Sequence, residues 1–102
     1  MRRLRDFSRA ELAKFNGHDG EPVYIALKGV VFDVSSSGFY GPDGGYALLA
    51  GRDASRALAK MKLDPDLVHD PRTDDLSSAE TALLTEWYDK LSAKYPIVGS
   101  LR

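Results

Sequence analysis

Cysteine is absent from all 102 residues of the chain. Cysteine thiols form disulfides, bind zinc and iron–sulfur clusters, and act as nucleophiles in one large class of enzymes. All of these sites are therefore excluded. The missing cysteine leaves the cellular compartment open, because a domain of this length does not need disulfides to fold.

Histidine is scarce, and long apolar runs are missing. The two histidines, His18 and His69, lie far apart in sequence among polar and turn-forming neighbours. We interpret them as surface residues rather than as a paired metal site. No segment approaches the roughly 18 apolar residues that a membrane-spanning helix needs. No apolar run follows the basic residues 1–5 as it would in a signal peptide, so we expect a soluble, cytoplasmic protein.

Excess charge and familiar catalytic motifs are also missing. The 14 basic and 15 acidic residues leave a net charge of -1, which gives no general attraction to nucleic acid. The glycines match neither a P-loop nor a dinucleotide fingerprint, and no Gly-x-Ser-x-Gly elbow is present. The pair Asp74 and Asp75 lies in a polar turn, where solvated or helix-capping carboxylates are expected. We therefore expect no enzymatic activity and no nucleic-acid partner.

The first half of the chain predicts a short helix followed by a hairpin. Ser8 and Glu11 have capping-box spacing, and the Asn-Gly pair at 16–17 is a usual helix stop. Two β-rich runs, 23–27 and 30–34, are separated only by a Lys-Gly pair, which is typical of a hairpin. Side-chain alternation in the second run places Val30, Phe32 and Val34 on one face, and Val31 and Asp33 on the other.

The second half predicts more helix and a last strand. Asp53 is a candidate N-cap for a helix over 54–61, and a turn-rich stretch over 63–75 contains Pro65 and Pro71. Ser77 and Glu80 form a second capping box before the clearest helical pattern, which Pro96 ends before a short strand over 97–99. The fold class is therefore α+β, with a small mixed sheet, short helices and one domain over residues 1–102.

A loop with two tyrosines offers the strongest functional signal. Tyr40 and Tyr46 bracket a segment rich in glycine and proline, and Lys94 and Tyr95 follow the last helix. A phenolate oxygen can ligate ferric haem iron. If the C-terminal segment packs beside the loop, these groups meet around an apolar pocket. Tyrosines at these positions also fit half-buried aromatic residues with surface hydroxyls, so the residue types alone leave both interpretations open. We expect the pocket walls to include Leu48, Leu49, Leu58 and Met61.

An ordered series of motifs resembles a known family. The motifs occupy residues 24–34, 39–42, 46–58, 87 and 94–99. They are similar to those of the membrane-associated progesterone receptor family, a cytochrome b5-like haem/steroid-binding group, and the resemblance covers about residues 6–101. It implies the cytochrome b5-like fold, with haem held between helices above a small sheet.

The resemblance also assigns roles to the tyrosines. It implies that Tyr46 is the iron ligand and that Tyr40 hydrogen-bonds the ligand or the haem. It places Lys94 and Tyr95 against a haem propionate or the ligating phenolate. The sequence departs from the family at Gly45, where relatives often have proline, which suggests a more mobile loop before binding. The two-histidine ligand set of true cytochrome b5 proteins, with its His-Pro-Gly-Gly loop, is missing.

These ligands favour haem binding over electron transfer. An anionic oxygen ligand stabilises ferric iron, and one protein ligand leaves the second iron face open. We expect five-coordinate ferric haem b, used for haem binding or delivery or in regulating haem enzymes such as a cytochrome P450. The family resemblance also permits a haem-dependent homodimer. One alternative is a haem-independent module for a steroid, another flat apolar ligand or a protein; b5-type electron transfer is less favoured. Many relatives have a membrane anchor that is missing here.

Overall fold

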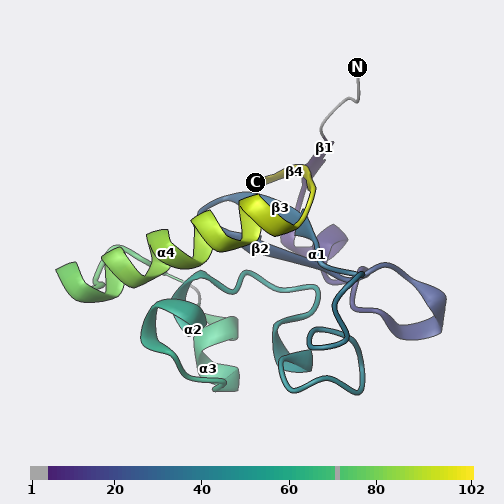
Figure 1. Ribbon diagram of the computed structural model, residues 1–102, viewed down its shortest axis with the longest axis horizontal. Coiled ribbons are helices and arrows are strands. Elements are labelled where there is room, and N and C mark those ends of the chain that lie inside the picture. The colour runs from purple at the N-terminus through teal and green to yellow at the C-terminus, as the bar shows by residue number, and fades with distance from the viewer. Residues whose placement is uncertain (1–4, 71) are drawn as a thin grey trace.

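Four short strands form one mixed sheet in the computed structural model, which describes residues 5–70 and 72–102 (Figure 1). The strand order is β1-β4-β3-β2. β1 runs parallel to β4, and the other neighbours are antiparallel. The first and last strands are therefore neighbours. The strands are β1 (Arg5–Phe7), β2 (Tyr24–Leu27), β3 (Val30–Asp33) and β4 (Ile97–Leu101).

The predicted hairpin is confirmed in β2 and β3. Leu27 pairs with Val30 across a two-residue turn, in which Lys28 and Gly29 have φ angles of 51° and 77°. Positive φ at both turn positions matches the right-handed twist of the strands. The predicted alternation is also confirmed, because Phe32 packs in one hydrophobic cluster and Val31 in another.

Helix α1 (Arg9–Leu12) begins as predicted but ends early. Its capping box is complete: the Glu11 backbone N–H donates to Ser8 Oγ at 3.1 Å, and the Ser8 N–H donates to Glu11 Oε1 at 3.0 Å. The expected extension to residues 16–17 was wrong. After Leu12 the chain turns toward the start of β2, where the Tyr24 N–H donates to the Phe15 carbonyl at 2.9 Å.

Strand β1 was not predicted. This strand has one buried residue, Phe7, after two exposed charged ones, so it has no apolar alternation of its own. It pairs with β4 at Gly99, where an added Cβ would lie 1.9 Å from the Arg5 carbonyl oxygen. The close approach of β4 therefore holds β1 in place.

Three further helices cover one side of the sheet: α2 (Ser55–Lys60), α3 (Pro65–His69) and α4 (Ser78–Lys94). In Figure 1, α4 runs along the sheet, with α2 and α3 below it. The capping box at the start of α4 is confirmed: the Glu80 N–H donates to Ser77 Oγ at 3.1 Å. The chain also has two 3₁₀ turns, η1 (His18–Gly20) and η2 (Ala47–Leu49).

The region between α2 and α4 differs from its prediction in detail. The turn-rich stretch contains the five-residue helix α3, which Asp64 caps by accepting from the Asp66 N–H at 3.0 Å. Pro71 lies outside the described residues. Asp74 and Asp75 are exposed, as expected for solvated carboxylates, and Asp75 also forms an ion pair with Arg56 of α2. A proline at the first helical position starts α3 instead of preventing it.

The sheet separates two hydrophobic clusters. The smaller contains Phe7, Leu12, Ala26 and Val31, with Phe15 and Tyr24 packed against it. The larger lies between the sheet and helices α2 and α4, and it also contains Tyr40 and Tyr95. The candidate site therefore lies on the larger of the two cores.

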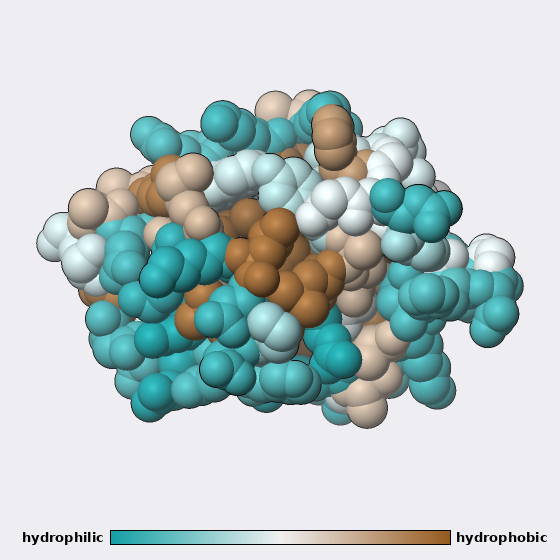
Figure 2. All heavy atoms as spheres, turned by 90° about the horizontal axis from the view of Figure 1, so that it is seen from below, coloured by the Kyte–Doolittle hydropathy of each residue, from teal (hydrophilic) through white to brown (hydrophobic). Residues whose placement is uncertain are grey.

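Seen from below, the surface is largely hydrophilic and has a compact apolar patch near its centre (Figure 2). Among the described residues, no helix has the length and apolar character needed to cross a membrane.

Candidate functional site

The loop over residues 39–46 and the C-terminal half of α4 enclose a cavity of about 460 Å³, which we call the tyrosine cleft. Its volume is in the range of small-molecule sites. All four residues predicted for the site, Tyr40, Tyr46, Lys94 and Tyr95, line it. The other lining residues are Phe39, Trp87, Lys90, Leu91 and Ala93.

A smaller cavity of about 170 Å³ adjoins the tyrosine cleft, and we call it the side lobe. Tyr46 and Trp87 line both cavities. The other residues of the side lobe are Ala57, Leu58, Met61, Lys62 and Leu63. Tyr46 and Trp87 therefore form a wall that the two cavities share.

Two of the four expected wall residues do line these cavities, and two do not. Leu58 and Met61 line the side lobe. Leu49 is fully buried in the core, and Leu48 lines a separate groove behind the loop. Both belong to η2, whose tight turn directs them away from the cleft. No helical turn was predicted for this segment, because glycines flank it on both sides.

Three phenol rings pack together in the cleft. The rings of Tyr40 and Tyr46 stack with centroids 5.6 Å apart, and Tyr95 meets Tyr40 edge-on at 6.3 Å. Tyr40 and Tyr95 are buried, with 5% and 6% exposure, whereas Tyr46 is partly exposed. Tyr46 is thus the phenol that a ligand can reach most directly.

The hydroxyls of these tyrosines are available to a ligand. Within residues 5–70 and 72–102, no hydrogen-bond partner is present for Tyr40, Tyr46 or Tyr95, and no side-chain oxygen is both fully buried and unsatisfied. Each hydroxyl therefore reaches accessible space. Buried tyrosines usually find a partner inside the protein, so three unpaired phenols in one cleft are a feature of a binding site.

Burial gives Tyr40 a role different from that of a metal ligand. Desolvation, with smaller contributions from the charges of Tyr95 and Tyr46, raises the pKa of Tyr40 to about 12. At neutral pH its hydroxyl is therefore protonated. Tyr40 can donate a hydrogen bond to an anionic oxygen beside it, in keeping with the supporting role expected for it.

Two lysines of α4 lie over aromatic rings at the cleft. Lys90 Nζ is 5.3 Å from the Trp87 ring centroid, and Lys94 Nζ is 5.5 Å from the Tyr95 centroid. The site prediction included Lys94 but missed Phe39, Trp87 and Lys90. Helical spacing could have found the two α4 residues, because positions 87, 90 and 94 share one helix face.

A glycine fixes the shape of the tyrosine loop. The Tyr46 N–H donates to the Phe39 carbonyl at 2.7 Å and thereby closes the loop. A Cβ at Gly44 would lie 2.2 Å from both the Gly38 and the Phe39 carbonyl oxygens. At Gly45, an added Cβ would meet nothing within 4 Å. The loop therefore requires glycine at 44 but not at 45.

The donor groups of the cleft are oxygens and ammonium groups. Among the described residues, no cluster of three or more histidine, aspartate or glutamate side chains could hold a metal ion. His18 and His69 are exposed, as predicted, and both line the groove behind the loop rather than the cleft. A planar ligand that carries a metal ion with one coordination site for a phenolate oxygen fits this donor set.

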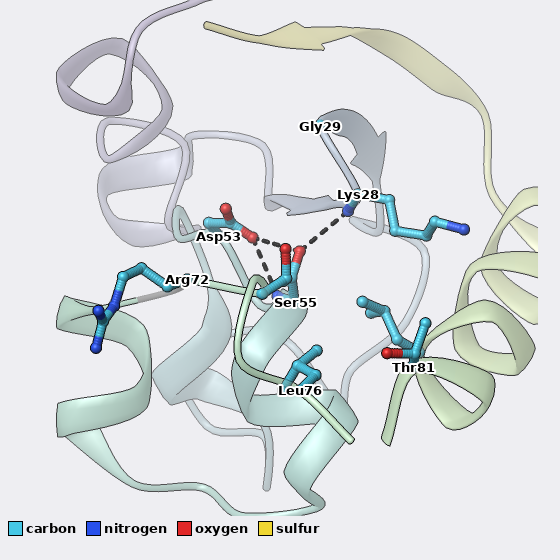
Figure 3. A pocket seen from close by; sticks show the side chains of 9 residues that line it. Lys28, Gly29, Asp53, Ser55, Arg72, Leu76 and Thr81 are labelled. Atoms are coloured by element: carbon cyan, nitrogen blue, oxygen red, sulfur yellow. Dashed lines mark hydrogen bonds between the residues drawn. The ribbon is translucent and has the colours of Figure 1, made fainter. Parts of the chain in front are cut away.

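A separate cavity of about 420 Å³ lies between the hairpin turn, α2 and the start of α4 (Figure 3). Ser55 Oγ donates to Asp53 Oδ1 at 2.7 Å and accepts from the Lys28 N–H at 3.0 Å. Burial raises the pKa of Asp53, which also accepts from the Ser55 N–H. The predicted N-cap was wrong by one residue, because Ala54 is the N-cap of α2 and no side chain among the described residues caps this helix. The side chains of Lys28 and Arg72 extend away from Asp53 and Ser55. These polar groups satisfy one another's hydrogen-bonding needs, and their bonds link the hairpin turn to α2.

Comparisons with known proteins agree with this geometry. The sequence profile of the Cytochrome b5-like Heme/Steroid binding domain matches residues 8–102. A solved Arabidopsis thaliana structure, described as having a cytochrome b5 like fold, superposes with a TM-score of 0.86 at 43% identity and covers 96% of this chain and 91% of its own. The predicted cytochrome b5-like fold is confirmed.

Two curated relatives match nearly all of this chain. Human membrane-associated progesterone receptor component 2 is 42% identical over 95% of this chain and 45% of its own length. The cytochrome P450 regulator dap1 of Schizosaccharomyces pombe is 39% identical over 95% of this chain and 63% of its own length. The chain thus spans less than two thirds of each. It belongs to the cytochrome b5-like heme/steroid binding domain family, in the membrane-associated progesterone receptor group.

Proposed function

We propose that the tyrosine cleft binds ferric haem b, with the Tyr46 phenolate as the only protein ligand of the iron. One observation carries this proposal: Tyr46 is the accessible phenol of the tyrosine cleft and also lines the side lobe, and no histidine in the described part of the chain lines either cavity. When bound, the haem would supply an iron centre that an anionic oxygen ligand keeps ferric. The open second face makes b5-type electron transfer the less favoured use.

The other cleft residues have supporting roles in this proposal. With haem bound, the neutral hydroxyl of Tyr40 would donate to the phenolate oxygen of Tyr46; the centroids of the two stacked rings are 5.6 Å apart. Lys94 and the Tyr95 hydroxyl bind a propionate, because both lie on the same wall of the cleft. Trp87 and Leu91 exclude water from the apolar part.

In the cell, we propose a non-enzymatic role in haem binding or delivery, or in the regulation of a haem enzyme such as a cytochrome P450. The S. pombe relative is named a cytochrome P450 regulator, which supports this class of partner. A cytoplasmic location and a haem-dependent homodimer are part of the same proposal. Size-exclusion chromatography with and without haemin tests the homodimer.

A haemin titration tests the iron ligand. We expect the wild-type protein to give a high-spin ferric spectrum, and Tyr46→Phe to lose most haemin uptake. Tyr24→Phe is the matched control, because Tyr24 stacks on Phe15 at 4.5 Å in the other core. An unchanged spectrum in Tyr46→Phe would refute the assignment, and a low-spin six-coordinate spectrum would support electron transfer instead.

A second candidate is a haem-independent site for a steroid or another flat apolar molecule, or for a protein. The family description includes steroid binding, and most of the cleft wall is aromatic or aliphatic. Protein expressed with a haem supply would then stay colourless and still bind such a ligand.

A further inference from the structure

The charge of the cleft is one-sided. Lys90 and Lys94 line the tyrosine cleft, and Lys62 lines the side lobe. Among the described residues, no aspartate or glutamate lines either cavity. Three acidic residues are sequence neighbours of lining residues: Asp64 follows Leu63, Glu86 precedes Trp87 and Asp89 precedes Lys90, but none of the three lines either cavity. Among the described residues, the charged side chains that line the two cavities are therefore all lysines.

These lysines are also held where a ligand would meet them. The ammonium groups of Lys90 and Lys94 lie over the Trp87 and Tyr95 rings, and cation–π attraction favours that position. Lys60 of α2, by contrast, is neutralised by Glu80, with Nζ and Oε2 2.9 Å apart. Within the described part of the chain, Lys62, Lys90 and Lys94 form no such ion pair.

We infer that the cleft prefers flat apolar ligands with an anionic group, such as a sulfated or carboxylated steroid, over their neutral counterparts. The inference rests on the proposed function only in using the same cleft. The apolar body lies against Tyr46 and Trp87, and the anionic group pairs with Lys90 or Lys94. A neutral ligand covers the same ammonium groups without giving them a partner, which costs binding free energy.

The single tryptophan of the chain provides the measurement, because Trp87 lines both cavities. Dehydroepiandrosterone and its sulfate ester are titrated into haem-free protein while Trp87 fluorescence is followed. We expect the sulfate ester to bind roughly two- to fivefold more tightly, in line with the modest strength of exposed ion pairs. The preference should shrink as salt is added, because salt screens exposed charges.

Variants locate the effect. In Lys90→Gln and Lys94→Gln, we expect the preference for the sulfate ester to fall toward onefold. Lys28→Gln is the matched control, because Lys28 is also exposed and lies 5.4 Å from the Tyr88 ring centroid, outside the cleft. The control should keep the full preference.

The result is separable from the haem proposal. Equal affinity for both steroids, binding of neither, or equal loss of preference in Lys28→Gln would overturn the inference. Haemin uptake that depends on Tyr46 would still stand in each of those cases. Conversely, a preference for the sulfate ester that depends on Lys90 and Lys94 would support the inference even if haemin did not bind.

Discussion

At the scale of single residues, the environment of each tyrosine separates its role from those of the others. Tyr24 stacks on Phe15 in the smaller core, and Tyr88 meets the edge of Phe32. Tyr40 is buried and keeps its proton, whereas Tyr46 is partly exposed. The sequence could predict a site around Tyr40 and Tyr46, but the order of exposure depends on how α4 packs over the loop.

Ser55 offers a test of a buried polar contact. In Ser55→Ala, the Lys28 N–H loses its acceptor and Asp53 loses one donor. We expect the free energy of unfolding to fall by about 1–3 kcal/mol, the usual cost of leaving buried polar groups unpaired. Urea denaturation measures it.

Ser92→Ala is the control for Ser55→Ala, because the exposed Ser92 hydroxyl bonds to the Tyr88 carbonyl within α4. Its effect should stay within about 0.5 kcal/mol. Equal effects of the two substitutions would contradict the role assigned to Ser55.

At the scale of elements, the tyrosine loop owes its shape to one glycine. In Gly44→Ala, the new Cβ would collide with the Gly38 and Phe39 carbonyls. The Phe39 carbonyl accepts the hydrogen bond from the Tyr46 N–H that closes the loop. We expect haemin affinity to fall at least tenfold, because Tyr46 can no longer hold its position beside Tyr40. Gly45→Ala should bind haemin like the wild type, since its Cβ has free space. Similar binding by both variants, measured by the same titration, would show that the loop adapts.

Elements with local signals could be predicted, and those that depend on distant partners could not. The capping boxes at Ser8 and Ser77 placed the starts of α1 and α4 correctly. The β1 strand was missed because only its pairing with β4 makes it a strand. The end of α1 was wrong because the bridge between Asn16 and Val23 competes with the helix.

The same division holds for the site. Tyr40, Tyr46, Lys94 and Tyr95 were predicted together through resemblance to a family, and the fold brings them into one cleft. Leu48 and Leu49 were misplaced because the 3₁₀ turn η2 has no distinctive sequence pattern. Leu58 and Met61 were expected as wall residues, but the sequence could not show that they form a lobe beside the cleft, since this depends on how α2 packs against α4.

At the scale of the whole molecule, Glu11 joins the two ends of the chain. Its carboxylate binds Arg5 of β1 at 2.9 Å and Arg102, which follows β4, at 3.0 Å. The same carboxylate completes the capping box of α1 through the Ser8 N–H. One side chain therefore stabilises the contact between the first strand, the first helix and the last strand.

Glu11 should make stability depend on acid pH. Hydrogen bonds from the Ser8 backbone, then from Arg5, Ser8 and Arg102, lower its pKa from 4.5 to about 2. A carboxylate with a lowered pKa stabilises the fold above its unfolded pKa, and this contribution is lost as pH falls from about 4.5 to about 2.

Glu11→Gln should accordingly flatten the loss of stability in this pH window, measured by thermal unfolding at a series of pH values. Glu21→Gln is the control, because Glu21 is exposed and has no ion pair among the described residues. A pH profile of Glu11→Gln that matched the wild type would contradict the assignment.

The strand order has a consequence for synthesis on the ribosome. Because β4 lies between β1 and β3, the sheet cannot close until β4 has left the exit tunnel. Lys94 and Tyr95 emerge just before β4, so the cleft forms after the β2–β3 hairpin. A nascent chain could fold this hairpin early, but it would capture a ligand only once β4 has emerged.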